Sequence, residues 1–192
     1  MALPAVTGLF ALSSNAILII AGENYLCAQM SLKWLSIALI FALIACLFGM
    51  SVLLPHGKER IFLLSTIVGA TFNIVANFVL IPIFKQNAAA FTTAVSQYIV
   101  FIICVKYSKD YVDMKLSYKS IVSTLLGCLS IIAVCMIIKA MGYNNLIETI
   151  LCIIISCIVY GVIGIVTKNS AFSEVMSSLM KFVKNKMLQR KQ

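Results

Sequence analysis

Long apolar runs, separated by short polar segments, fill most of the chain. Within a run, polar residues do not gather on one helical face, and apolar and polar residues do not alternate. A helix that is apolar on all sides is typical of a membrane span, and about 20 residues cross ~30 Å of hydrocarbon. The pattern therefore predicts an all-α integral membrane protein with six transmembrane helices. These helices are predicted at Leu3–Ala21, Trp34–Leu54, Ile61–Phe84, Ala88–Val105, Ile121–Ile138 and Leu146–Val166.

The pattern changes after the sixth run, where residues 168–192 are rich in lysine. Apolar residues in this tail, among them Phe172, Val175 and Leu179, recur at helical spacing, and most lysines fall between them. This spacing predicts a basic amphipathic helix on the anionic inner leaflet, following a six-helix bundle formed by residues 1–167. A solvated tail without helical structure is the alternative interpretation.

The composition agrees with a membrane protein, because 62% of the residues are hydrophobic and only 11% are charged. A soluble domain of 192 residues needs more polar surface than that to cover its core. The seven cysteines show no C-x-x-C spacing, and His56 is the only histidine. The cysteines therefore read as small buried residues. We expect neither a bound metal nor another cofactor.

Basic residues are distributed unevenly between the connections of the predicted helices. Three of the fifteen, Lys33, Lys85 and Lys139, fall on one side, and the other twelve fall on the opposite side. By the positive-inside rule, the side with twelve is cytoplasmic, and so are both termini. This bias accounts for the net charge of +9, so no nucleic-acid partner is expected. Glu148 lies near a predicted outer end, where long side chains usually reach water.

The most informative polar residues lie in the third and fourth predicted helices. Gly69, Asn73 and Asn77 are spaced by four residues and share one helical face, and Thr93 and Gln97 share a face of the next helix. Amides in hydrocarbon must find partners, so these residues either line a polar pathway or bond neighbouring helices. Amides suit sugar hydroxyls, because each amide offers donors and an acceptor.

Helix packing is the competing interpretation of this region. Gly69 allows two helices to approach closely, and intramembrane asparagines commonly bond one helix to another. Pro82 and the polar run Lys85–Asn87 are predicted to end the third helix before the next one begins.

Gly69, Asn73 and Asn77, followed by Ile81, Pro82 and the run Ala88–Thr93, form a pattern that resembles a known family. The stretch is similar to the C-terminal part of the polysaccharide and lipid-linked-oligosaccharide flippases. These are the O-antigen transporter type of the multidrug/oligosaccharide/polysaccharide exporter superfamily. The turn Leu53–Arg60 fits the same pattern.

The resemblance implies that a lipid-linked oligosaccharide, a precursor of lipopolysaccharide or another polysaccharide, is flipped across the bacterial cytoplasmic membrane. It implies alternating access between two bundles and no covalent chemistry. It places Asn73, Asn77, Thr93 and Gln97 along the substrate pathway and Gly69 and Pro82 at helix contacts. The family is about twice as long, so the partner is a missing N-terminal six-helix bundle or a second chain. Membrane lipid is the other expected partner, because it surrounds the helices.

The sequence is also compatible with three other classes of function. A drug or cation exporter of the same superfamily would be expected to hold an intramembrane carboxylate, and none lies mid-span. A membrane enzyme, such as a sugar polymerase or an acyltransferase, would need catalytic groups at the membrane face, where His56 and loop charges are the candidates. A membrane subunit that does not itself transport is the third alternative.

Overall fold

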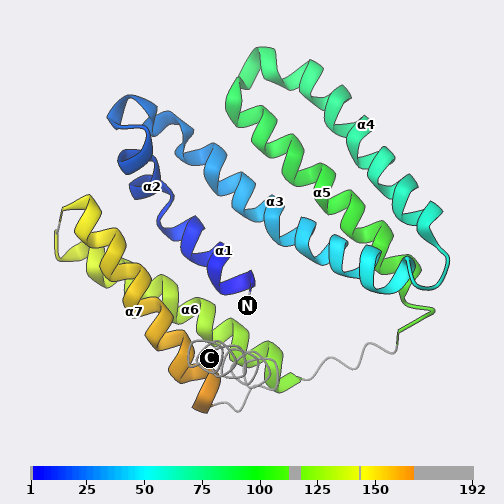
Figure 1. The fold of residues 1–192 in the computed structure, drawn as a ribbon. Helices are drawn as coiled ribbons and strands as arrows, with labels where there is room; N and C mark the ends of the chain where they lie inside the picture. Colours follow the sequence, from blue (N-terminus) through cyan, green and yellow to red (C-terminus); the bar gives the residue numbers. More distant parts are fainter. Residues whose placement is uncertain (1, 113–117, 143, 167–192) are drawn as a thin grey trace, which may run out of the picture.

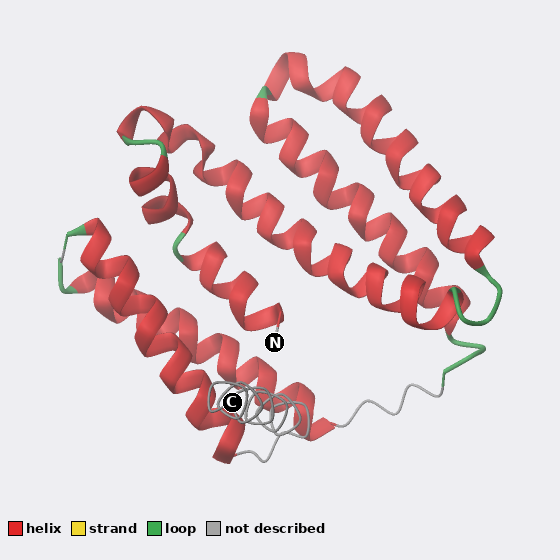
Figure 2. Cartoon of the chain, viewed as in Figure 1, coloured by secondary structure: helices red, strands yellow, loops and turns green. Residues whose placement is uncertain are grey.

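The computed structural model describes residues 2–112, 118–142 and 144–166, and every regular element in these ranges is helical (Figures 1 and 2). Five helical segments are long and apolar enough to cross a membrane, or six if the bent pair α1 and α2 forms one span. The chain is therefore a multi-pass α-helical membrane protein by helix length and hydropathy. The elements are α1 (Ala2–Ala11), α2 (Ser13–Ile20), a 3-10 turn η1 (Glu23–Ala28), α3 (Gln29–Phe48), a π turn η2 (Gly49–Leu53), α4 (Glu59–Phe84), α5 (Gln86–Ser108), α6 (Tyr118–Ala140) and α7 (Asn145–Val166).

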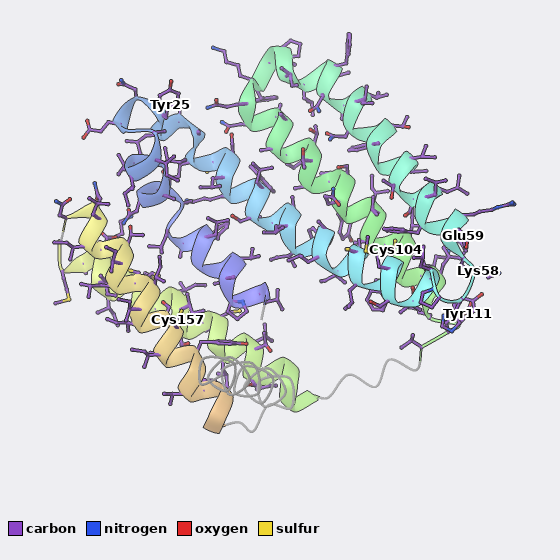
Figure 3. All side chains as sticks on the ribbon, viewed as in Figure 1. Tyr25, Lys58, Glu59, Cys104, Tyr111 and Cys157 are labelled. Atoms are coloured by element: carbon purple, nitrogen blue, oxygen red, sulfur yellow. The ribbon has the colours of Figure 1, made fainter. Side chains whose placement is uncertain are left out.

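Helices α3, α4 and α5 form one packed unit, which we call the α3–α4–α5 unit. Helix α5 lies between the other two and packs along both of them. The buried cluster of this unit comprises Ala45, Leu53, Val100 and Cys104, with phenylalanines packed around it. Cys104 lies where α5 meets α4, and its sulfur is 3.4 Å from Ser65 Oγ (Figure 3). Most of α4 faces outward, as its long row of exposed apolar side chains shows.

The remaining helices form the second group, the α1–α2–α6–α7 unit. Helices α6 and α7 pack as an antiparallel pair, α2 lies against α7, and α1 lies between α3 and α6 (Figure 1). The buried cluster here comprises Ile131, Cys135, Ile138 and Cys152. Gly127 on α6 makes room for the ring of Tyr160 on α7, because a Cβ there would lie 2.6 Å from the Tyr160 Cδ2 atom. Helix α1 therefore connects the two units of the protein.

The first predicted span, Leu3–Ala21, is not one straight helix. Helices α1 and α2 meet at Leu12 with a bend of 68°. Ser13, Ser14 and Asn15 follow the bend directly, and side chains of these types compete with helical hydrogen bonds of the backbone. The predicted extent of this segment is confirmed, and a bend at the Ser13–Asn15 cluster is one of the two interpretations of those residues.

The turn between α4 and α5 is shorter than the predicted polar loop. Only Lys85, with φ of 52°, lies outside the helices, and Gln86 and Asn87 already belong to α5. Asn87 Oδ1 accepts a hydrogen bond of 2.8 Å from Ser31 Oγ on α3, so this end of α5 is tied to its neighbour. Pro82 lies inside α4, which continues to Phe84, and the proline itself is exposed. The end of α4 is therefore set by Lys85.

Other predicted boundaries differ from the structure by less than two turns. Helix α3 begins at Gln29 instead of Trp34, and its apolar segment continues through η2 to Leu53. Figure 3 shows Lys58, Glu59 and Tyr111 together at one end of the α3–α4–α5 unit and Tyr25 at the other end of the molecule. The predicted amphipathic tail, residues 168–192, lies outside the described residues.

Candidate functional site

A groove runs over α5 between α3 and α4, because these two helices pack on α5 and hardly on each other. Its volume is about 330 Å³, within the range of small-molecule sites, which is about 300–1,000 Å³. Small residues of α3 form one wall, α4 forms the other, and α5 forms the floor. The lining residues are Ala42, Ala45, Cys46, Phe62, Thr66, Gly69, Ala70, Asn73, Ser96, Gln97 and Val100.

The α4 wall meets the floor of the groove at Gly69, which is buried. A Cβ at this position would lie 2.6 Å from Val100 Cγ2 and 3.2 Å from the Ser96 carbonyl oxygen. Real side chains do not tolerate the first of these distances, so glycine sets how closely α4 and α5 approach. The rigid contact holds the polar residues of α4 and α5 on either side of it in fixed positions.

Asn77 is engaged in contacts between α4 and α5. Its Nδ2 donates to Asn73 Oδ1 at 3.0 Å, and its Oδ1 accepts a hydrogen bond of 2.5 Å from Thr92 Oγ1. Thr92 is buried and also lies within hydrogen-bond distance of the Ala89 carbonyl oxygen. Asn77 does not line the groove. The geometry gives Asn77 a role in helix packing.

Asn73 on the α4 wall and Gln97 on the α5 floor both line the groove. The Asn77 bond uses Asn73 Oδ1, while Asn73 Nδ2 and the whole Gln97 amide make no hydrogen bond to another described residue. Both side chains are half-buried. The groove therefore presents one amide nitrogen from α4 and a complete amide from α5 to whatever enters it.

Two hydroxyls add to this polar surface, and the sequence reasoning did not single them out as site residues. Thr66 Oγ1 donates to the Phe62 carbonyl oxygen at 3.0 Å, and Ser96 Oγ donates to the Thr93 carbonyl oxygen at 2.9 Å. Each hydroxyl keeps lone pairs free to accept. Thr66 lies seven residues before Asn73, on the same helical face, a spacing that is visible in the sequence but common in any helix.

Thr93 and Pro82 do not line the groove. Thr93 Oγ1 donates to the Ala89 carbonyl oxygen of its own helix at 2.7 Å. The structure thus brings Asn73 and Gln97 together, places Asn77 beside them in a packing contact, and separates Thr93 from them.

A second pocket, of about 510 Å³, lies in the α1–α2–α6–α7 unit and is almost entirely apolar. Leu12 and Ala16 line it from the bent pair, and Cys135 and Cys152 line it from α6 and α7. Ser156 Oγ also lines it and has no hydrogen-bond partner in the described part of the chain. This pocket offers little that would recognise a polar ligand.

Glu148 departs from the expectation that it reaches water, since only 6% of its surface is exposed. It lies four residues before Cys152, which is fully buried, so it shares the packed face of α7. It also lies in the first turn of α7, where the partial positive charge of the helix N-terminus favours a carboxylate. The position on the helix face, rather than the depth in the span, decides its burial.

Among the described residues, no group of three or more His, Cys, Asp or Glu side chains is arranged to hold a metal ion. Comparisons with protein-family models, with curated proteins and with solved structures gave no match. Fold and site together define a multi-pass α-helical membrane protein with a polar groove between three of its spans.

Proposed function

We propose that the chain is the C-terminal part of a transporter that flips a lipid-linked oligosaccharide across the bacterial cytoplasmic membrane. The observation that carries this proposal is the groove between α3, α4 and α5, which is lined by Asn73 and Gln97 of membrane-spanning helices; Asn73 Nδ2 and the Gln97 amide make no hydrogen bond to another described residue. Polar groups in spans are costly, and those facing a cavity instead of lipid are typical of substrate pathways.

The chemistry of the groove suits a sugar. Each sugar hydroxyl both donates and accepts a hydrogen bond, and the free amide atoms with the Thr66 and Ser96 oxygens supply both kinds of partner. The apolar side chains of Phe62 and Val100 line the same groove and can pack on the C–H faces of a sugar ring. Binding and release of a head group require no covalent step, so the proposed protein is not an enzyme.

The proposed mechanism is alternating access between this bundle and an N-terminal bundle or second chain of the same orientation. The exposed apolar face of α4, beside the groove, offers that partner a surface. Twelve of the fifteen basic residues place both termini in the cytoplasm. In Figure 1 the N-terminus, the α3–α4 turn and the ends of α5 and α7 lie toward one side, as this orientation requires.

The test uses the groove variants Asn73→Leu and Gln97→Leu in the native gene. Each variant loses hydrogen bonds to the head group, so display of surface polysaccharide is expected to fall roughly five- to tenfold. The amount of the chain in the membrane, measured on the same cells, should stay within about twofold of the wild type for Gln97→Leu. Asn73→Leu also removes the acceptor of the Asn77 amide, so its display is compared per amount of chain in the membrane.

Thr93→Val is the matched control, because Thr93 lies on α5 beside the groove residues, bonds only its own helix and does not line the groove. It should leave both measurements unchanged. Wild-type polysaccharide display by both groove variants at normal abundance would refute the proposed function.

A further inference from the structure

We propose that the groove selects an uncharged sugar unit and excludes sugars that carry a carboxylate. This inference rests on the proposed function and names the chemical class of the head group. It is based on the charges and hydrogen-bonding atoms that the three helices bring to the groove.

The lining residues of the groove carry no formal charge at neutral pH. Their free polar atoms are balanced between donors and acceptors. Asn73 Nδ2 and Gln97 Nε2 donate, and Gln97 Oε1 accepts together with the Thr66 and Ser96 hydroxyl oxygens, whose protons are already used. Such a set matches hydroxyls, which also donate and accept. It matches a carboxylate poorly, since that group only accepts.

The basic residues of the packed helices lie far from the two amides of the groove, and only its Phe62 end comes within a turn of Lys58 and Arg60. Arg60 precedes Asn73 by 13 residues and Lys85 follows it by 12, which is about 18 Å or more along the helix axis at 1.5 Å per residue. Lys106 follows Gln97 by nine residues on α5, and Lys33 precedes Ala42 by nine on α3, or about 14 Å in each case. A carboxylate bound at the Asn73 and Gln97 amides would therefore lose water without gaining a partner of opposite charge, which is unfavourable.

Gln97 is the residue that determines this selectivity. It sits on the groove floor, its amide makes no hydrogen bond to another described residue, and Gly69 fixes the distance between the floor and the α4 wall. A guanidinium at this position would supply the missing positive charge and paired donors for a carboxylate. The substitution Gln97→Arg is thus expected to reverse the preference.

Cys46 provides a reporter, because this exposed cysteine lines the α3 wall of the groove. The full chain is reconstituted in phosphatidylcholine nanodiscs and labelled with N-ethylmaleimide, and the rate at each cysteine is read by mass spectrometry. Cys27 is exposed and lines neither pocket, so it reports general accessibility. The probes are octyl β-glucoside and octyl β-glucuronide, with octanol as the control for the alkyl chain.

Octyl glucoside is expected to slow labelling of Cys46 relative to Cys27, and octyl glucuronide should need a concentration roughly tenfold higher for the same protection. Gln97→Arg should reverse this order. Equal protection by the two glycosides in the wild-type chain would overturn the inference and leave the proposed function standing. Absence of protection by either glycoside, or equal protection by octanol, would overturn the sugar site itself and the inference with it.

Discussion

The α3–α4–α5 unit and the α1–α2–α6–α7 unit are both built from apolar helices, yet their polar side chains have different surroundings. In the first unit, Asn77 and Thr92 bond across helices, and Asn73 and Gln97 face an open groove. In the second, Ser13 Oγ and Asn15 Nδ2 are buried at the bend of α1 and α2 without a hydrogen-bond partner among the described residues, next to an almost apolar pocket. A polar side chain in a membrane span is therefore not by itself evidence of a binding site. Its role depends on whether it faces an open groove or bonds a neighbouring helix.

The largest effect should come from filling the close contact between α4 and α5 in the first unit. Gly69→Val would push against Val100 and against the Ser96 carbonyl oxygen, which is backbone and has no alternative rotamer. We expect a loss of about 1–3 kcal/mol in the free energy of unfolding and less folded protein. The measurement is the thermal midpoint of the chain in detergent micelles.

Gly161→Val on α7 is the control for this prediction, because nothing lies within 4 Å of a Cβ at Gly161. It should change the midpoint little. Equal losses from the two glycine variants would show that the close approach of α4 and α5 does not hold the groove in place.

The next effect concerns the hydrogen bonds between α4 and α5. Asn77→Leu leaves Thr92 without its partner on α4 and leaves Asn73 Oδ1 unbonded, at a cost of about 1 kcal/mol. In a double-mutant cycle with Thr92→Val, the two losses should not add, since both remove the same bond. Additive losses in the thermal midpoint would contradict a packing role for Asn77.

The smallest expected effect is a gain in stability instead of a loss, and it concerns the α1–α2–α6–α7 unit. Ser13 is fully buried, and its hydroxyl has no partner among the described residues. Ser13→Ala removes this unpaired group and is expected to leave stability unchanged or raise it by up to about 1 kcal/mol. Ser65→Ala is the matched comparison, because Ser65 is equally buried and its hydroxyl donates to the Phe62 carbonyl oxygen at 2.7 Å. Loss of this hydrogen bond should lower the thermal midpoint. A larger loss for Ser13→Ala than for Ser65→Ala would reverse the comparison.

Part of the candidate site could be predicted from spacing. Asn73 and Gln97 stand out as amides within apolar runs, and Gly69 shares the face of Asn73. Spacing could not separate Asn73 from Asn77, because they lie on one face of α4 and differ only in what α5 presents to each. Thr92 opposes Asn77, while the open groove lies beside Asn73. Nor could spacing show that Thr93 bonds its own helix, since any helical threonine can do so.

The sequence by itself determined the helical class and the approximate extent of each apolar helix, because the cost of an unpaired backbone in hydrocarbon leaves few alternatives to long apolar helices. The tertiary structure decided the rest. The bend at Leu12, the one-residue turn at Lys85, the burial of Glu148 and the groove over α5 all depend on which helix faces lie against each other. Apolar faces look alike in a sequence, so lateral contacts, shape and a few buried polar atoms select one packing from many.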